Sequence, residues 1–377
     1  MNGVRYAAAR AAAPRVAEHF AKYITAARRD VNRTIAFAPD ASTIETIIDA
    51  AFWASLRREE GYTPTISLAY LPAEQAGRPV LFERPISLQP ESLAKVAPAV
   101  ERAGIHLGVW DREGELCVWG TTRTLPVSCF VLEVNSPGLL VVKHHRGEES
   151  GKYVNVAVLE GDHLKMIDER ASSLPDCPPL LSSLLGFDAP ASWAQSLNVL
   201  VQLAASMRAH KRGGALLVVP SGSEDWRHSI VQPIVYAIRP FFSELAELMT
   251  HPATERRRWQ EALSRAVDII AGLTAVDGAT IITDRYELLA FGAKIARRDG
   301  CPRVESVTVT EPIEGSTATT LNPTELGGTR HMSAAQFVHD QRNAVALVAS
   351  QDGHFTVFAW SPCESMVHAH RVESLLL

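Results

Sequence analysis

Hydrophobic and polar positions alternate at short intervals through the first half of the chain. Apolar residues recur at helical spacing from Ile44 to Leu56, and Ser42 followed by Glu45 is typical of a capping box at the start of a helix. Short strands are expected at 65–71, 128–134, 139–143 and 153–159, with a hairpin at 107–120 that turns at 111–114. This half therefore predicts an α+β domain built on a twisted sheet.

The second half shows longer helical periods and fully apolar runs. Helices are expected at 193–210 and 255–273, and the run from Ala215 to Val219 is apolar throughout, which favours a buried strand. Further strands are expected at 279–282 and 288–291, with a closing hairpin at 344–360 around an Asp-Gly turn. The pattern predicts an α/β domain with a mixed twisted sheet flanked by helices.

A proline-rich segment separates these two patterns. Four prolines fall within 172–192, and such a segment is typical of a domain boundary. A chain of 377 residues is also too long for one ordinary small domain. We therefore expect an N-terminal domain over 1–190 and a C-terminal domain over 195–377.

Composition and charge exclude several classes of protein. Hydrophobic residues make up 46% of the chain and charged residues 21%, which is typical of a globular protein. The net charge of −5 argues against a general nucleic-acid-binding surface. Five scattered cysteines without a Cys-x-x-Cys pair disfavour a disulfide scaffold or a zinc ribbon and fit a reducing compartment. No apolar run approaches the roughly 18 residues of a membrane span, so a cytoplasmic protein is expected.

The stretch 327–333 contains the residue types that hold a phosphate group. Two glycines permit close approach by a ligand, Thr329 and Ser333 offer hydroxyl groups, and Arg330 and His331 offer further donors. We expect a helix to start with Ser333 near its N-cap, which would add free backbone N–H groups. The alternative is a capped helix after a glycine loop, with Arg330 in a surface ion pair.

A second candidate is the tripeptide Asp277-Gly278-Ala279 at the start of an expected strand. The two small residues leave room for a flat ligand against the backbone. The carboxylate can bind a divalent metal ion and accept a proton from a hydroxyl group. Asp-Gly is also a common turn, and taken alone this tripeptide favours the turn.

Together the two stretches resemble the diadenylate cyclase domain, a family that joins two ATP molecules into cyclic di-AMP. The family carries an Asp-Gly-Ala motif and a downstream Gly-Thr-Arg-His-Arg motif. Here the first motif is complete at 277–279, and the second stands as Gly328-Thr329-Arg330-His331 followed by Met332. The stretches 214–219, 292–295 and 346–353 also resemble the family, in the same order. The resemblance covers about 195–377.

The resemblance implies a role for each matched residue and two kinds of ligand. Asp277 would bind Mg²⁺ or Mn²⁺ and activate the attacking 3′-hydroxyl of ATP. The other contacts implied are Gly278 and Ala279 along the nucleoside, Gly328, Thr329, Arg330 and His331 at the phosphates, and hydroxyl contacts from Ser333 and Ser350. Two domains would face each other across two ATP molecules, so self-association is expected.

The chain departs from the family at Met332, where the family has a second arginine. Loss of one charge-assisted contact weakens binding by roughly 1.5–3 kcal/mol. Two alternatives therefore stay open beside an active cyclase: a catalytically silent nucleotide-binding sensor, and an interaction protein without a ligand site.

The first half resembles a sensor-type domain, DACNV, that is found fused to such cyclases. It contains no motif with a mechanism that can be derived from its residues. The resemblance implies regulation of the C-terminal domain by a small ligand or a protein bound at the N-terminal domain, an expectation that rests on analogy.

Overall fold

The computed structural model describes residues 5–27, 34–58, 61–145, 153–168, 194–250 and 256–377. The chain divides into two compact units, Met1–Ile167 together with Leu377, and Asp168–Leu376. The expected boundary segment at 172–192 lies outside the described residues. Each unit contains one mixed sheet with helices, so the chain is an α/β protein as predicted.

The N-terminal unit is built on an eight-stranded sheet in the order β2-β4-β3-β1-β5-β6-β7-β8. All neighbouring strands run antiparallel except β1 and β3, which are parallel. The strands are β1 (Ile66–Tyr70), β2 (Val80–Ser87), β3 (His106–Arg112), β4 (Glu115–Thr122), β5 (Phe130–Ser136), β6 (Leu139–His145), β7 (Tyr153–Glu160) and β8 (His163–Met166). The helices are α1 (Ala7–Ala27), α2 (Ala41–Ser55) and α3 (Pro90–Val96).

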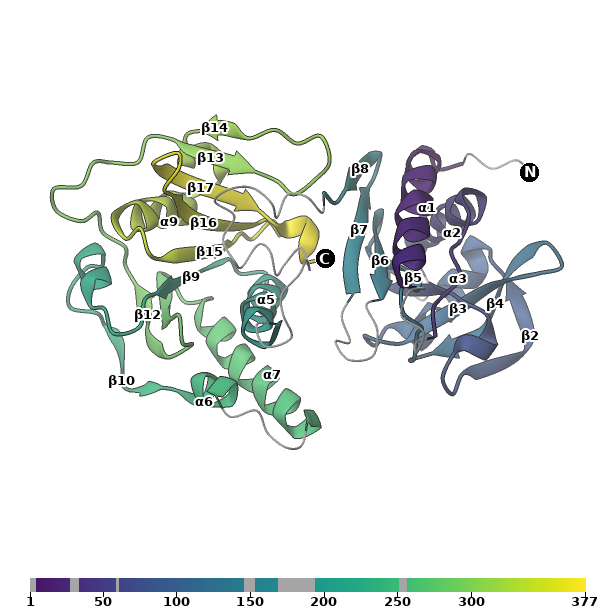
Figure 1. The fold of residues 1–377 in the computed structure, drawn as a ribbon. Helices are drawn as coiled ribbons and strands as arrows, with labels where there is room; N and C mark the ends of the chain where they lie inside the picture. Colours follow the sequence, from purple (N-terminus) through teal and green to yellow (C-terminus); the bar gives the residue numbers. More distant parts are fainter. Residues whose placement is uncertain (1–4, 28–33, 59–60, 146–152, 169–193, 251–255) are drawn as a thin grey trace. The chain divides into compact units, whose positions relative to one another are not determined.

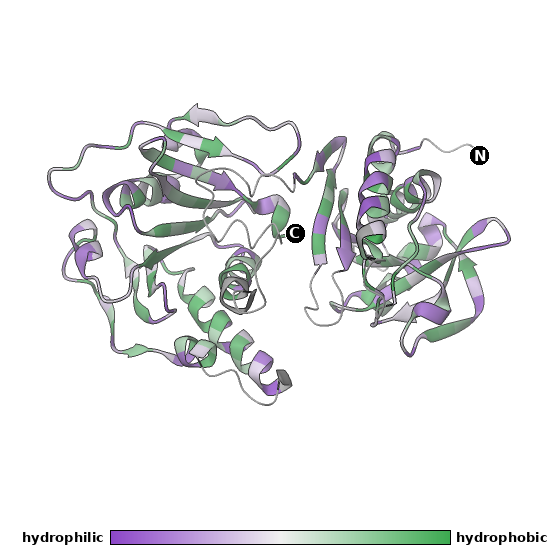
Figure 2. Ribbon diagram, viewed as in Figure 1, coloured by the Kyte–Doolittle hydropathy of each residue, from purple (hydrophilic) through white to green (hydrophobic). Residues whose placement is uncertain are grey.

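Alternation along the strands gives this sheet two different faces. In β5, Phe130 and Leu132 lie in a large cluster with side chains of α1 and α2, whereas Val131 lies in a smaller cluster on the other face. Figure 1 shows α1 and α2 side by side, and Figure 2 shows both hydrophobic and hydrophilic residues along α1. The main core of the unit therefore lies between these helices and the sheet.

Helix α2 begins two residues earlier than the expected capping box. Its N-cap is Asp40, whose Oδ1 accepts a hydrogen bond from Thr43 N at 2.7 Å. Asp is as good an N-cap as Ser, and its side chain reaches the N–H group three residues on. The prediction of a cap at Ser42 was therefore wrong in position, although the helix itself is present. Leu56 is the C-cap of α2 and is 50% exposed, so it does not belong to the buried face.

The C-terminal unit is built on a nine-stranded sheet in the order β10-β12-β11-β9-β15-β16-β17-β13-β14. Its strands are β9 (Gly214–Val219), β10 (Tyr236–Phe242), β11 (Ala279–Thr283), β12 (Leu288–Ala293), β13 (Val307–Thr310), β14 (Thr319–Leu321), β15 (Val345–Ala349), β16 (Phe355–Ser361) and β17 (Met366–Arg371). Its helices are α5 (Ala194–Ala209), α6 (Glu244–Thr250), α7 (Arg256–Leu273), α8 (Pro323–Leu326) and α9 (Thr329–Asp340).

Helices cover both faces of this sheet, which explains the apolar run of β9. Leu217 and Val219 lie in one cluster with side chains of α9, and Leu216 lies in a second cluster with side chains of α5 and α7. Figure 1 shows α5 and α7 side by side. A strand buried on both faces has no polar side to present, so every position is apolar.

No helix in the described ranges is long and apolar enough to span a lipid bilayer.

Replacement of Phe358 by Ala should strongly destabilise the C-terminal unit. Phe358 is 0% exposed in the cluster beneath α9, and truncation of a buried Phe costs about 3–5 kcal/mol. Amide hydrogen exchange of β15 and β16 peptides would report the loss as faster exchange. The matched control is Phe241→Ala on the edge strand β10, where the ring is 44% exposed. An effect at Phe358 no larger than that at Phe241 would contradict this assignment of the core.

Candidate functional site

One row of strand ends in the C-terminal sheet brings together segments that are far apart in the sequence. We call this row of strand ends the sheet edge. β9 and β11 are parallel and both begin at this edge, where β12 and β15 end. Ala279 pairs with Ala215 on β9 and with Ala293 on β12, while Ala349 of β15 pairs with Gly214. The residues just before β9 and β11 and just after β12 and β15 therefore lie along one row.

Asp277 lies on this edge immediately before β11. Its side chain is 86% exposed and forms a hydrogen-bonded ion pair with Lys294, which follows β12. The hydrogen bond from Lys294 and the charge of that ammonium lower the pKa of the Asp277 carboxyl, and the charge of Arg330 lowers the pKa further. The field of Arg330 thus reaches the carboxylate of Asp277, although 53 positions separate the two residues in the sequence.

Glycine is required next to Asp277 because two backbone segments nearly touch there. Gly278 has φ +115°, and a Cβ at this position would lie 2.5 Å from the carbonyl carbon of Gly292. The ring of Tyr236 lies over Gly292 and stacks on Phe291 at 4.8 Å between ring centroids. Sequence reasoning identified Gly278 but not Tyr236, because that contact depends on the pairing of β10 with β12.

Helix α9 begins at this edge without any acidic residue. Its N-cap is Gly328, which provides no side-chain cap, and its first turn contains no Asp or Glu. Ser333 was expected near the N-cap, and this prediction was wrong, because the helix already begins at Thr329. The stretch Thr329 to Met332 contains no helix breaker, so the first turn forms directly after the glycines. Backbone N–H groups at the N-terminal end of a helix favour an anion.

Arg330 lies against the starts and ends of the central strands. A Cβ at Gly213 would lie 3.1 Å from Arg330 Nη1 and 3.3 Å from the carbonyl oxygen of Ala349. Arg330 Nε is buried and has no hydrogen-bond partner within the described part of the chain. The guanidinium is thus fixed beside the sheet edge with unused hydrogen-bonding capacity.

His331 points away from solvent into the core. It is 3% exposed, its Nε2 lies 3.5 Å from Thr356 Oγ1, and its ring meets Phe358 edge-on. Burial lowers its pKa, and nearby positive groups lower it further. A Cβ at Gly327 would lie 2.5 Å from Nδ1 of this ring. The structure therefore places His331 beneath the glycine turn, where the neutral ring supports that turn.

The expected hydroxyl contacts are spread over the same end of the unit. Thr329 is exposed on the first turn of α9, and Ser333 is half-buried in the second turn. Ser350 follows β15, and its Oγ accepts a hydrogen bond from His354 N at 3.1 Å within the β15–β16 hairpin. Ala279 is buried as the first residue of β11.

The single carboxylate of Asp277 fits a divalent cation that is held partly by the protein and partly by the phosphates of a bound ligand. Among the described residues no group of three or more His, Cys, Asp or Glu side chains is arranged to hold a metal ion. Mg²⁺ is commonly bound by one or two carboxylates together with substrate phosphates and water. A single exposed carboxylate beside the N-terminal end of a helix matches that pattern.

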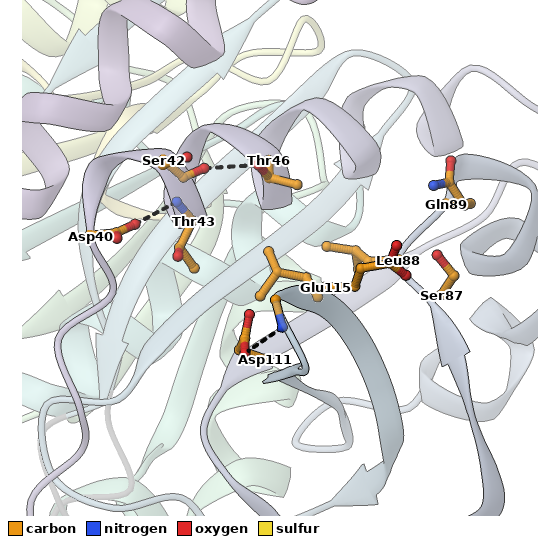
Figure 3. A pocket seen from close by; sticks show the side chains of 11 residues that line it. Asp40, Ser42, Thr43, Thr46, Ser87, Leu88, Gln89, Asp111 and Glu115 are labelled. Carbon is orange, nitrogen blue, oxygen red and sulfur yellow. Dashed lines mark hydrogen bonds between the residues drawn. The ribbon is translucent and has the colours of Figure 1, made fainter. Parts of the chain in front are cut away.

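The N-terminal unit contains a separate polar cavity of about 460 Å³. Asp40, Ser42, Thr43 and Thr46 contribute to its wall from the start of α2, and Asp111 and Glu115 contribute from the ends of β3 and β4 that form the hairpin (Figure 3). Asp40 Oδ1 accepts from Thr43 N, and Asp111 Oδ1 accepts from Gly114 N. Three carboxylates and no lysine or arginine line this cavity, so it disfavours anionic ligands.

Comparison with known proteins identifies part of the N-terminal unit. Residues 33–123 match the model of a family described as the probable sensor domain DACNV. The sensor-type domain predicted for the first half is confirmed over this stretch. All residues that line the acidic cavity fall within it. No curated protein matches the chain.

Replacement of Lys294 by Gln should raise the pKa of the Asp277 carboxyl toward that of an isolated aspartate. The Lys294 hydrogen bond and charge are the main causes of the lowered pKa. The ion pair stabilises the fold above the unfolded-state pKa of Asp277, and that contribution is lost as the pH falls through the lowered folded-state pKa. Carboxyl ¹³C NMR titration measures the shift, with Lys95→Gln as the control. An unchanged Asp277 titration would show that the ion pair does not persist in solution.

Replacement of Gly278 by Ala should destabilise the chain more than replacement of Gly300 by Ala. Both glycines have positive φ, so both variants carry a conformational cost of roughly 1–2 kcal/mol. Only the Gly278 variant also places a methyl group against the backbone of Gly292, since a Cβ at Gly300 would have no neighbour within 4 Å. Thermal denaturation compares the two variants. Equal losses would argue against close packing at the Asp277 turn.

Proposed function

We propose that the C-terminal unit is a diadenylate cyclase-like nucleotidyltransferase that condenses two ATP molecules into cyclic di-AMP or a related cyclic nucleotide. The observation that carries the proposal is that Asp277, just before β11, and Arg330, which lies against Gly213 just before β9, share one sheet edge, where the charge of Arg330 lowers the pKa of the carboxyl. The segment that contains Asp277 supplies a carboxylate, which can bind a metal ion and accept a proton from a hydroxyl group. The other supplies a guanidinium and helix N–H groups for phosphate.

The proposed reaction needs mainly positioning and charge compensation. The 3′-oxygen of one ATP forms a bond to the α-phosphorus of the other, the bond from that phosphorus to the bridging oxygen breaks, and pyrophosphate leaves. Asp277 accepts the proton of the attacking hydroxyl. Arg330 and the N–H groups of α9 hold the phosphates, and the bare backbone at Gly278 lets the nucleoside approach β11.

Mg²⁺ or Mn²⁺ would be held by Asp277 together with phosphate oxygens. When bound, it neutralises negative charge on the phosphates. The Asp277 carboxylate is paired with the ammonium group of Lys294, whose side chain is 56% exposed. A metal ion would have to displace that ammonium group. An exposed ammonium can leave the carboxylate at little cost, since surface ion pairs contribute only about 0–1 kcal/mol.

Two rounds of bond formation require two nucleotides in opposed orientations. One C-terminal unit has one such sheet edge with one carboxylate, so it would hold one of the two nucleotides. The proposal therefore includes self-association of two C-terminal units face to face. It also includes regulation by the N-terminal sensor-type domain.

A catalytically silent nucleotide-binding sensor is the second candidate. Two observations favour it: Met332 in place of the family's second arginine, and the pairing of Asp277 with Lys294. In this reading the same edge binds ATP, but the attacking hydroxyl is never activated.

Incubation of the full chain with ATP and Mg²⁺ or Mn²⁺, followed by mass spectrometry, distinguishes these functions. The proposal predicts a cyclic dinucleotide and pyrophosphate, and loss of at least a hundredfold in rate for Asp277→Asn, because general-base catalysis contributes roughly 10²–10⁴-fold. Asp299→Asn, on an exposed loop, is the control. ATP-dependent thermal stabilisation without product, removed by Arg330→Ala, supports the silent sensor. If the chain gives no product and ATP does not stabilise it, both functions are refuted.

A further inference from the structure

We infer that Arg303 supplies the second phosphate-binding guanidinium of the C-terminal unit, in place of the arginine that is missing at position 332. Its Nη2 lies 3.4 Å from Met332 Sδ, so the guanidinium reaches the first turn of α9 from a neighbouring loop. This assignment rests on the proposed function and adds a residue to its nucleotide site.

The loop that carries Arg303 is held on α9 by one buried side chain. Gln336 Nε2 donates to the carbonyl oxygen of Pro302 at 3.0 Å, and Gln336 Oε1 accepts from Val304 N at 3.0 Å. The residues on both sides of Arg303 are therefore fixed. Gln336 follows Met332 by one helical turn, so both face the same flank of α9.

A second contact holds the earlier part of the same loop. Asp340, one further turn along α9, accepts hydrogen bonds from Arg298 N and from Gln336 Nε2, each at 2.9 Å. Asp340 and Gln336 are both buried. Buried and mutually satisfied polar groups hold a backbone in one position. The backbone position of Arg303 is thus built into the fold, and its exposed side chain extends from that position to Met332.

The resulting charge arrangement is unfavourable without an anion. Arg303 and Arg330 both lie at the N-terminal end of α9, which carries the positive end of the helix dipole. Neither guanidinium has a carboxylate partner within the described ranges, and the first turn holds no acidic residue. The helix dipole disfavours a cation at this end. A polyphosphate would reverse that effect.

Met332 gives the Arg303 side chain an apolar surface to lie on. A thioether is a weak acceptor and does not neutralise the guanidinium. The contact therefore positions the group while leaving its charge and most of its donors available. An arginine at 332 would have to share this space with Arg303, so the two positions are alternative sources of one charge.

The test compares Arg303→Gln, the matched control Arg297→Gln on the same loop, and the double variant Arg303→Gln/Met332→Arg. Isothermal titration of the full chain with a non-hydrolysable ATP analogue and Mg²⁺ gives Kd, and titration with adenosine gives the contribution of the nucleoside alone. Arg303→Gln should raise Kd for the ATP analogue by roughly ten- to a hundredfold and leave adenosine unaffected. The double variant should recover most of the loss.

Stability of the free protein provides a readout that a merely structural residue would not give. Arg303→Gln should leave Tm without ligand unchanged or higher, and should reduce the Tm increase caused by the ATP analogue. A lowered Tm without ligand would show that Arg303 is structural and would overturn the assignment.

The remaining outcomes separate this assignment from the function on which it rests. If Arg330→Gln weakens binding of the ATP analogue but Arg303→Gln does not, Arg303 is excluded and the proposed function stands. An equal loss in Arg297→Gln would show a general charge effect and would also exclude Arg303. Failure of the unmodified chain to bind the analogue would overturn both proposals.

Discussion

The geometry of the candidate site depends on the pairing of β9 with both β11 and β15. This pairing sets the start of β11, the end of β15 and the start of β9 along one edge. Because β9 is buried on both faces, its side chains pack into two cores, and a change of register would misplace side chains in both. A hydrophobic constraint in the centre of the sheet thus positions an exposed carboxylate at its edge, beside a guanidinium that comes from a helix on one face.

Electrostatics then gives this edge its character. Asp277 is compensated by Lys294 and lies in the field of Arg330, whereas the two arginines at the start of α9 have no carboxylate partner in the described part of the chain. The edge therefore carries surplus positive charge next to one carboxylate, in a chain with a net charge of −5. The cavity of the sensor-type domain has the opposite character, since its charged wall residues are all carboxylates. The charges at the two places differ in sign. An anionic nucleotide is therefore favoured at the sheet edge of the C-terminal unit and disfavoured in the cavity of the N-terminal unit.

The sequence predicts most of the architecture because periodicity reports burial directly. The apolar run of β9 and the stripe of α7 follow from the cores on which they pack. The two helix starts were misplaced for a local reason: Asp40 and Gly328 compete as caps with the serines chosen at 42 and 333. Several residues can begin a helix, and the tertiary contacts of the first turn decide among them.

The candidate site was only partly accessible to sequence reasoning. Asp277 and Arg330 stood out because glycines accompany them, and glycines mark positions where a backbone comes close to another group. The role of Lys294 at the carboxylate required the register of β11 with β12. Arg303 gives no local signal at all, because its place is set by hydrogen bonds from Gln336, more than thirty positions further along the chain. The most direct test of the whole account is a crystal structure of the chain with a non-hydrolysable ATP analogue and Mg²⁺. The account predicts one triphosphate that contacts Arg330 and, through the metal, Asp277. A nucleotide bound elsewhere, with this edge empty, would contradict it.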